Sequence, residues 1–275
     1  MSEKFAEVNG INICYEILGK GYPLILIHGY GGTKETWFGM KNNLSKHFKL
    51  IIFDNRSAGK SDHLNEPITI QMFADDVKGL MDYLNIKKAH IGGESLGGMI
   101  AQQFVLNYPE MVKKLILINT HYSGIMGEII KRTTIQNFES GKLNPEDAFW
   151  ERAQFGFHIS FRKKLQTDPK KKFFDTFSVE DLIRMEAENP VSINDLENQA
   201  HAFENFNTLD KLIGIKNPTL LIAASHDRIL PNSQMKEMHE KIPNSTLKIL
   251  QKTGHFSTTS KAPEIVKLIL DFLIS

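Results

Sequence analysis

Cysteine is almost absent from this chain, which holds only Cys14 among its 275 residues. A single thiol cannot form an internal disulfide, nor can it supply a thiolate cluster for a metal ion. Cys14 lies in a strand-like run and is expected to be a small buried side chain. The cysteine usage fits a reducing compartment, and we expect a cytoplasmic protein.

An excess of charge of one sign and long apolar runs are also missing. The formal net charge is +1, which excludes a general attraction to nucleic acid or to acidic membranes. No apolar run approaches the roughly 20 residues that span a bilayer, and the first five residues do not resemble a secretory leader. We expect no nucleic-acid partner and no membrane, and the choice between monomer and homodimer stays open.

The motifs of cofactor and metal sites are incomplete. Gly59-Lys60-Ser61 resembles the end of a phosphate-binding loop, but Asp54 stands where that motif requires its first glycine. The glycines between positions 29 and 32 lack the G-x-G-x-x-G spacing of a dinucleotide site, and no histidine pair has the H-E-x-x-H spacing of a zinc hydrolase. The sequence therefore predicts neither a cofactor nor a metal.

Strand-like and helix-like segments alternate through most of the chain. Strands are expected at 5–8, 11–18, 24–27, 50–53, 90–92, 115–118, 219–224 and 246–250. Helices are expected near 35–44, 70–84, 96–107, 234–241 and 263–273. A turn at Asn9-Gly10 separates the first two strands. This order predicts an α/β fold with a doubly wound, mostly parallel eight-stranded sheet and helices on both faces.

The alternation stops between residues 122 and 212. This stretch has few strand-like runs, and it holds ten of the 18 phenylalanines. We interpret it as a helical cap over the carboxyl edge of the sheet, inserted in a core formed by residues 1–121 and 213–275. Most of its phenylalanines are expected to pack within the cap, and a few to line a cavity beneath it.

Residues 92–98 read Gly-Gly-Glu-Ser-Leu-Gly-Gly and lie between a strand-like and a helix-like run. This G-x-S-x-G pattern holds a serine in a tight, strained turn that exposes its hydroxyl. Side chains two positions either side would collide, so glycine is favoured at Gly93 and Gly97. The pattern predicts Ser95 as a nucleophile; the alternative is a glycine-rich structural turn with a bystander serine.

A serine nucleophile needs a base, and the base needs an orienting acid. Asp227 follows the strand at 219–224 and is predicted as the acid, and His255 follows the strand at 246–250 and is predicted as the base. The order serine, aspartate, histidine is that of nucleophile-elbow hydrolases. His226 is the nearest rival base, but its side chain would diverge from its neighbour Asp227. The loop after the strand at 115–118 could also have supplied the acid, but it carries Asn119, which cannot hold a negative charge.

The run His28-Gly29-Tyr30-Gly31-Gly32 follows the first parallel strand. A tetrahedral intermediate needs two backbone amides aimed at its oxyanion. The amides of Leu96, directly after the serine, and of Tyr30 are predicted to supply them. For His28 a structural role beneath the loop is favoured over a catalytic one.

These motifs resemble the α/β-hydrolase superfamily, in particular its capped esterases and 3-oxoadipate enol-lactonase-like serine hydrolases. The resemblance covers the loop at His28, the run 54–62, the serine turn, and the segments 218–227 and 254–272. It implies a serine hydrolase of carboxylesterase type that acts on small esters, lactones or thioesters, with no cofactor. The chain departs from the common pattern at Ser57, where relatives usually have glycine, and after His255, where an acidic residue is often found.

Other functions remain open on the same motifs. The triad also serves carbon–carbon bond hydrolases, hydroxynitrile lyases and perhydrolases, and some relatives are small-molecule receptors with slow turnover. Dehalogenases and epoxide hydrolases are disfavoured, because they use aspartate where this chain has Ser95. The cavity is expected to be mostly apolar. A carboxylate-bearing substrate would be preferred if one cap arginine pointed inward, the candidates being Arg132, Arg152, Arg162 and Arg184.

Overall fold

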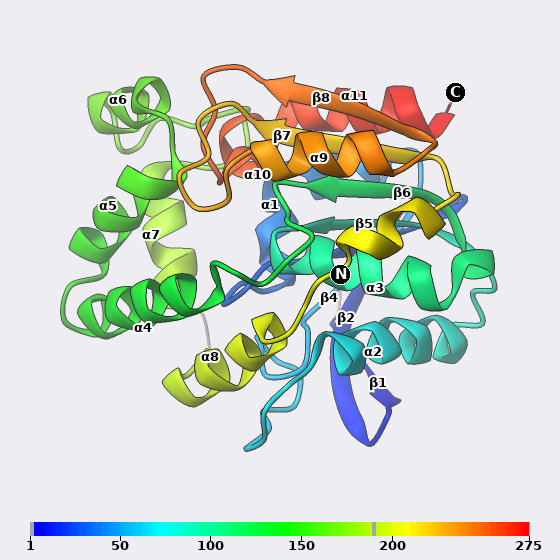
Figure 1. Cartoon of the computed structure of the whole chain (residues 1–275). Coiled ribbons are helices and arrows are strands. Elements are labelled where there is room, and N and C mark those ends of the chain that lie inside the picture. Colours follow the sequence, from blue (N-terminus) through cyan, green and yellow to red (C-terminus); the bar gives the residue numbers. More distant parts are fainter. Residues whose placement is uncertain (1–2, 189–190, 275) are drawn as a thin grey trace.

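The strands form one sheet of eight in the computed structural model, which describes residues 3–188 and 191–274. They are β1 (Lys4–Val8), β2 (Ile11–Leu18), β3 (Pro23–Ile27), β4 (Lys49–Phe53), β5 (Ala89–Glu94), β6 (Val112–Ile118), β7 (Thr219–Ala224) and β8 (Ser245–Leu250). Their order is β1-β2-β4-β3-β5-β6-β7-β8 (Figure 1). Only the β1–β2 and β2–β4 pairs of this sheet are antiparallel, which confirms the predicted mostly parallel architecture.

The burial of each strand follows its place in the sheet. Every residue of β5 and β7 is buried, as expected for parallel strands covered on both faces. The edge strand β8 alternates between half-buried and exposed positions, and only Leu250 at its end is buried. Asn9 and Gly10 have φ angles of 51° and 79°, so the hairpin of β1 and β2 closes with two left-handed residues, as predicted. Cys14 is fully buried on β2.

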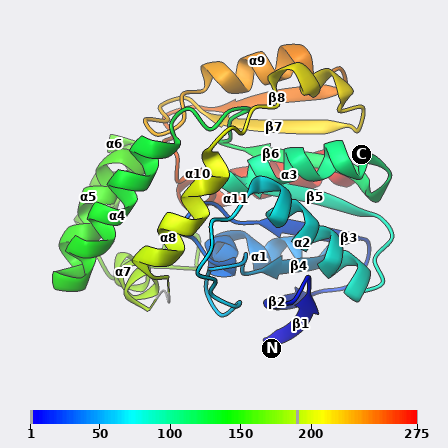
Figure 2. The same cartoon turned by 60° about the horizontal axis from the view of Figure 1, so that its bottom comes forward.

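Helices cover both faces of the sheet (Figure 2). One face carries α2 (Ile70–Tyr83), α3 (Leu96–Asn107) and α9 (Ser233–Lys241). The other carries α1 (Phe38–Leu44) and α11 (Ala262–Ile274). Short segments η1 (Lys34–Trp37), η2 (Pro109–Met111) and α10 (Ser257–Ser260) lie in the connections. Each face has its own apolar cluster, so the sheet is buried between two layers of helices.

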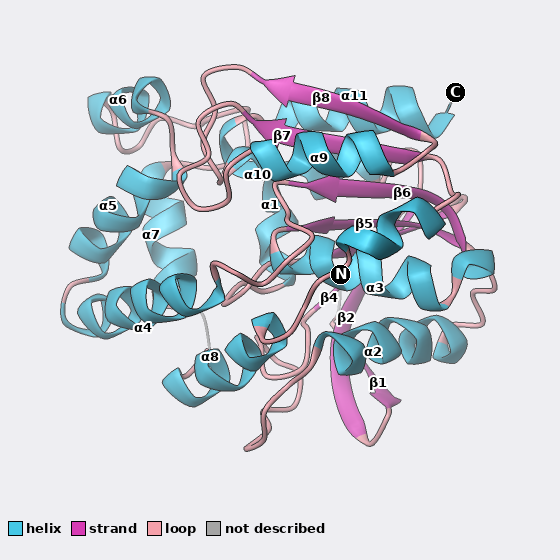
Figure 3. Ribbon diagram, in the orientation of Figure 1, coloured by secondary structure: helices cyan, strands magenta, loops and turns pink. Residues whose placement is uncertain are grey.

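The connection between β6 and β7 holds a group of helices at the carboxyl ends of the parallel strands (Figure 3). They are α4 (Gly127–Leu143), α5 (Pro145–Gly156), α6 (Ile159–Thr167), α7 (Val179–Ala187) and α8 (Ile193–Ala200), followed by η3 (His201–Phe203) and η4 (Leu209–Gly214). We call α4 to α8 the inserted helices. A separate apolar cluster joins α5, α6 and α7, and five phenylalanines belong to it: Phe149, Phe157, Phe161, Phe173 and Phe177.

Candidate active site

Ser95 lies at the junction of β5 and α3 with backbone angles of φ 55° and ψ −120°. A residue other than glycine rarely adopts this backbone conformation, so the surrounding structure must hold the turn in place. A Cβ added at Gly93 would collide with the carbonyl of Gly97, and one added at Gly97 would collide with the carbonyl of Ile27. Both glycines are therefore required by close backbone approach, which is the geometry expected of the serine turn.

Asp227 and His255 meet at the carboxyl ends of β7 and β8. His255 Nδ1 lies 2.7 Å from Asp227 Oδ2, and the two side chains are almost completely buried. The second carboxylate oxygen of Asp227 accepts hydrogen bonds from the amides of Ile229 at 2.9 Å and Leu230 at 2.8 Å. The acid is thus fixed by its own turn, and it leaves His255 Nε2 for another partner.

The protonation of His255 is set by competing influences. Burial lowers the pKa of the imidazole, but the charge and hydrogen bond of Asp227, together with the charge of Glu94, raise it above its ordinary value. A charged imidazolium is therefore stabilised here despite the desolvation of the ring. This is the property that a general base needs once it has taken a proton.

A cavity of about 470 Å³ lies between the sheet edge and the inserted helices. Ser95, His255 and the loop of residues 29–32 line it from the sheet side. Apolar residues line it from the inserted helices: Met126, Ile129, Ile130, Phe149, Ala153, Phe155, Phe157, Leu182 and Met185. The predicted nucleophile and base thus face one largely apolar space.

The predicted oxyanion loop touches the serine turn directly. A Cβ at Gly29 would lie 3.2 Å from Ser95 Cβ, so the loop backbone passes beside the nucleophile. The Tyr30 hydroxyl donates to the carbonyl of Leu196 at 2.8 Å, and the Gly31 amide donates to the side chain of Gln199 at 3.2 Å. Leu96 opens α3 and is buried. The use of the Tyr30 and Leu96 amides as an oxyanion hole stays a prediction.

His28 is bonded beneath this loop. Its Nε2 accepts the amide of Asn55 at 3.0 Å, which requires that the ring proton of the neutral imidazole sit on Nδ1. Nδ1 lies 2.9 Å from the carbonyl of Gly29 and donates to it. Burial lowers the pKa of His28 and favours this neutral form. Both ring nitrogens are occupied by backbone, which supports a structural role.

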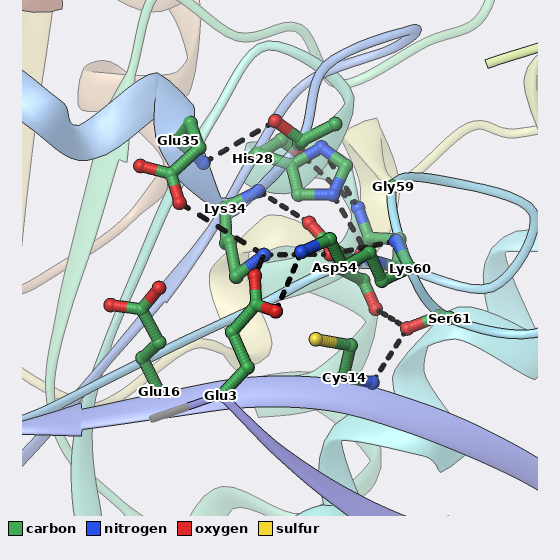
Figure 4. Close-up of polar contacts among 12 residues, drawn as sticks. Glu3, Cys14, Glu16, His28, Lys34, Glu35, Asp54, Gly59, Lys60 and Ser61 are labelled. Carbon is green, nitrogen blue, oxygen red and sulfur yellow. Dashed lines mark hydrogen bonds and ion pairs between the residues drawn. The ribbon is translucent and has the colours of Figure 1, made fainter. Parts of the chain in front are cut away.

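The buried Asp54 accepts several hydrogen bonds, which hold the neighbouring loop segments in place (Figure 4). It accepts the Lys34 amide at 2.7 Å, the Lys34 ammonium at 3.1 Å and the Lys60 amide at 3.0 Å. The Lys34 ammonium also pairs with Glu3 at 3.1 Å. Gly59 has a φ of 58°, and a Cβ there would collide with the Asp54 carboxylate. The Gly59-Lys60-Ser61 run therefore packs around an aspartate instead of a phosphate.

Ser57 adopts a left-handed conformation with a φ of 55°. Glycine is favoured in this region, so the backbone here is one that a glycine would adopt without strain. The serine adds bonds that glycine lacks, because its hydroxyl accepts the amide of Leu64 at 3.0 Å. Its carbonyl accepts the side-chain amide of Gln199. These two bonds hold the loop in its left-handed conformation at Ser57.

Asn119 appeared in the sequence only as a residue that cannot serve as the orienting acid. In the structure it connects the end of β7 with the loop that carries His255. Its Nδ2 donates to the carbonyl of His255 and to Ser257 Oγ, both at 2.7 Å. Its Oδ1 accepts the amide of Ala224 at 2.9 Å. The position of Asn119 at a strand end was visible in the sequence, but its three partners come from distant segments.

Glu94, the variable residue of the serine motif, is a second functional candidate that the sequence did not single out. It is buried and lines the cavity. Thr258 Oγ1 lies 3.0 Å from both of its carboxyl oxygens. Burial raises the pKa of Glu94 to about 7, while His255 and the bond from Thr258 lower it and Asp227 raises it. Nothing in the motif itself predicts this environment.

One of the four candidate arginines lines the cavity. Arg152 lies on α5, and burial lowers the pKa of its guanidinium to about 10. Arg184 is exposed and pairs with Asp181 at 2.8 Å. Arg228, beside the predicted acid, also reaches the cavity lining. The cavity is therefore largely apolar, with two arginines and two glutamates, Glu35 and Glu94, at its wall.

Within residues 3–188 and 191–274, no three histidine, cysteine, aspartate or glutamate side chains gather as metal ligands would. No helix in the same ranges is long and apolar enough to cross a bilayer.

Comparison with known proteins gives a consistent result. The profile of the alpha/beta hydrolase fold family matches residues 22–261. RutD of Caulobacter sp. (strain K31), provisionally named a carbamate hydrolase, is 24% identical over 257 residues, which are 91% of this chain and 90% of that protein.

Two solved structures share the fold over nearly the whole chain. The enol-lactonase from Burkholderia xenovorans LB400 superposes with a TM-score of 0.81 and 21% identity, covering 99% of this chain and all of the other. A malate-bound thermophilic esterase from Thermogutta terrifontis gives a TM-score of 0.81 and 22% identity, covering 99% and 98%. At these identities the likeness establishes the fold, and the two names differ in the substrate, a lactone in one case and an ester in the other.

Proposed function

Because this chain belongs to the alpha/beta hydrolase fold family, we propose that it is a serine hydrolase that cleaves small carboxylic esters, lactones or thioesters. Ser95 is the nucleophile, His255 the base and Asp227 the acid that orients the base. The chemistry needs no cofactor in this scheme. Its partner is a small ester-like molecule, and a cytoplasmic location stays a prediction from the sequence.

The reaction proceeds in two halves. His255 Nε2 takes the proton of Ser95 as its oxygen bonds to the acyl carbon, and Asp227 stabilises the imidazolium through Nδ1. The amides of Leu96 and Tyr30 hold the oxyanion, and His255 then protonates the leaving group. A water molecule, activated by the same histidine, releases the acid from Ser95 and restores the enzyme.

One observation carries this proposal more than any other. The 2.7 Å contact between His255 and Asp227 joins two loops 28 residues apart, and the histidine of this pair faces the same cavity as a serine held in a strained turn. We further propose that the inserted helices are the predicted cap, and that they choose the substrate.

The first test is labelling of the active-site serine. A fluorophosphonate should attach to the wild-type protein at Ser95, and a panel of p-nitrophenyl esters should then be hydrolysed at rates that labelling abolishes. Thr259→Ser offers a matched control, because it adds a second serine to the same cavity without the strained turn. Labelling anywhere but Ser95, or ester hydrolysis that survives full labelling, would remove the acyl-enzyme from the scheme.

Arg152 favours a second candidate within the same chemistry. A guanidinium in the wall of an apolar cavity is suited to bind a carboxylate, so an acid-bearing ester or an enol-lactone acid becomes the alternative substrate. The comparison is kcat/KM for p-nitrophenyl butyrate against a succinate half-ester. Arg152→Gln should reduce only the half-ester rate, and Arg184→Gln, an exposed arginine of the same region, should change neither. Equal rates for both esters in the wild type would favour the neutral substrate.

A further inference from the structure

Glu94 is a buried acid that the triad chemistry leaves unused. It ends β5, directly before Ser95, and only 6% of its surface is exposed. Its side-chain partner is the hydroxyl of Thr258, which lies within 3.0 Å of both carboxyl oxygens. One hydroxyl carries one proton, so it can satisfy only one of these oxygens at a time. Buried carboxylates normally have a cation or several donors, and this arrangement is unusual.

The protein groups that act on Glu94 come from the catalytic loops. His255 and Asp227 interact with it electrostatically, and Thr258 on α10 follows His255 by three residues. The effect is mutual, since the charge of Glu94 also raises the pKa of His255. Other charged or titratable groups around the site, among the described residues, are His28, Tyr30, Glu35, His121, Arg152 and Arg228.

We propose that Glu94 is a positioning residue for the base: its carboxylate stabilises the imidazolium that His255 becomes, and its own protonation removes that stabilisation. The inference rests on the proposed function of Ser95 and His255. When the Ser95 proton moves to His255 Nε2, the site gains a positive charge that interacts with both Asp227 and Glu94. Two carboxylates then share the stabilisation of one cation, and Thr258 keeps the second of them oriented.

The sign of the pH effect follows from this arrangement. An ionised Glu94 favours the charged imidazole, so it raises the pKa of His255 and moves the acid limb of the activity to higher pH. Removing the charge of Glu94 should move the acid limb of the activity to lower pH. It should also lower the rate on the plateau, because the same interaction stabilises the transition state. A change of one unit in the pKa of His255 corresponds to a factor of about ten in its protonation equilibrium. A shift of that size would therefore limit the loss of rate to about tenfold.

The decisive variant is Glu94→Gln, which keeps the shape of the side chain and its acceptor for Thr258. The pKa of His255, followed by NMR in the resting protein, should fall by about one unit. The histidine signal is identified among the ten by its loss in His255→Gln. The plateau of kcat/KM should fall up to about tenfold, with KM little changed. Glu7→Gln removes an equal charge from an exposed position on β1 and should alter neither quantity.

Thr258→Val provides a second, independent test. It removes the hydroxyl that favours the ionised form of Glu94, so the pKa of His255 should shift towards its value in Glu94→Gln. In the double variant the valine should add nothing. Equal shifts from Thr258→Val in both backgrounds would place the effect on Thr258 and contradict the role of Glu94.

The outcomes separate this inference from the proposed function. An unchanged pKa of His255 in both Glu94→Gln and Thr258→Val, with hydrolysis still dependent on Ser95, would overturn the role of Glu94 alone. If Ser95→Ala still hydrolysed esters while the pKa of His255 fell in Glu94→Gln, the proposed function would be wrong and the coupling of Glu94 to His255 would stand.

Discussion

The sheet and the inserted helices of this molecule are built on different principles. In the sheet, strand ends bring together residues far apart in the chain, and each candidate catalytic group is held by backbone. Asp227 accepts two amides of its own turn, and Asn119 bonds to segments more than 100 residues away. Three of the inserted helices, α5 to α7, instead pack around a small aromatic cluster. The chemistry thus depends on the rigid part, while the part that forms the cavity roof can vary.

This contrast is tested most severely at Ser95. Ser95→Ala should remove nearly all ester hydrolysis, a loss of roughly a million-fold in comparable triads, with the fold intact. His255→Ala should lose nearly as much, Asp227→Asn less, and the Ser95–His255 double variant little more than either single one. Steady-state kinetics on highly purified proteins measures this, with circular dichroism as the control for folding. Additive losses at Ser95 and His255 would show that the two do not act as one unit.

The next largest effect is expected at Asn119. Asn119→Ala leaves a carbonyl, a hydroxyl and an amide without their buried partner, and each such group costs about 1–3 kcal/mol. We expect a loss of about 2–4 kcal/mol in the free energy of unfolding, because some of these groups can relax. Urea unfolding measures it, and Asn42→Ala on the exposed side of α1 is the control. A loss below about 0.5 kcal/mol would contradict the view that backbone-bonded polar residues hold the catalytic loops.

The inserted helices should set the preference for acyl length. Each added methylene that fits an apolar cavity contributes about 0.8 kcal/mol, or about a four-fold gain in kcat/KM. We expect a rise from p-nitrophenyl acetate to the butyrate or hexanoate and then a fall. Phe155, which lines the cavity and is half exposed, limits the space, so Phe155→Ala should move the maximum to a longer chain. A flat series in both proteins would mean that the inserted helices do not select the acyl group.

The smallest effect is expected at Ser57. Ser57→Gly relieves a left-handed backbone worth about 1 kcal/mol, but it loses the hydrogen bond from Leu64, which is worth a similar amount. The stability of this variant should stay close to that of the wild type. Ser57→Ala keeps the strain and loses the bond, so it should be less stable by about 1 kcal/mol. Thermal unfolding of the two variants separates these cases, and equal stability would argue against strain at this position.

The sheet could be predicted closely from the sequence. The bounds of β2, β7 and α3 were expected to the residue, because continuous apolar runs between turn residues leave few alternatives. The prediction of an eight-stranded, mostly parallel sheet with helices on both faces is confirmed. The turn at Ser95 and the order of the triad residues followed from the glycines and the strand ends.

The rest could not be predicted because it depends on contacts between distant segments. The ends of the individual inserted helices have no clear periodicity, and their phenylalanines pack against one another across three helices. Glu94 occupies a position that any residue can fill in the motif, so its burial beside Thr258 appears only in three dimensions. Among four arginines of similar sequence context, only the fold distinguishes Arg152. The boundary between core and cap, and the roles of the triad, stay predictions.

The two bonds that tie the loop of Tyr30 and Gly31 to α8 have a consequence for exchange of parts between relatives. Tyr30 donates to the Leu196 carbonyl, and Gly31 donates to Gln199, so the loop beside the nucleophile is shaped in part by the inserted helices. A chimaera that received its roof from another protein would also need an acceptor for each donor. Substrate preference and catalytic geometry are therefore not fully separable modules here, and grafts that retain α8 should recover function more often than grafts that replace it.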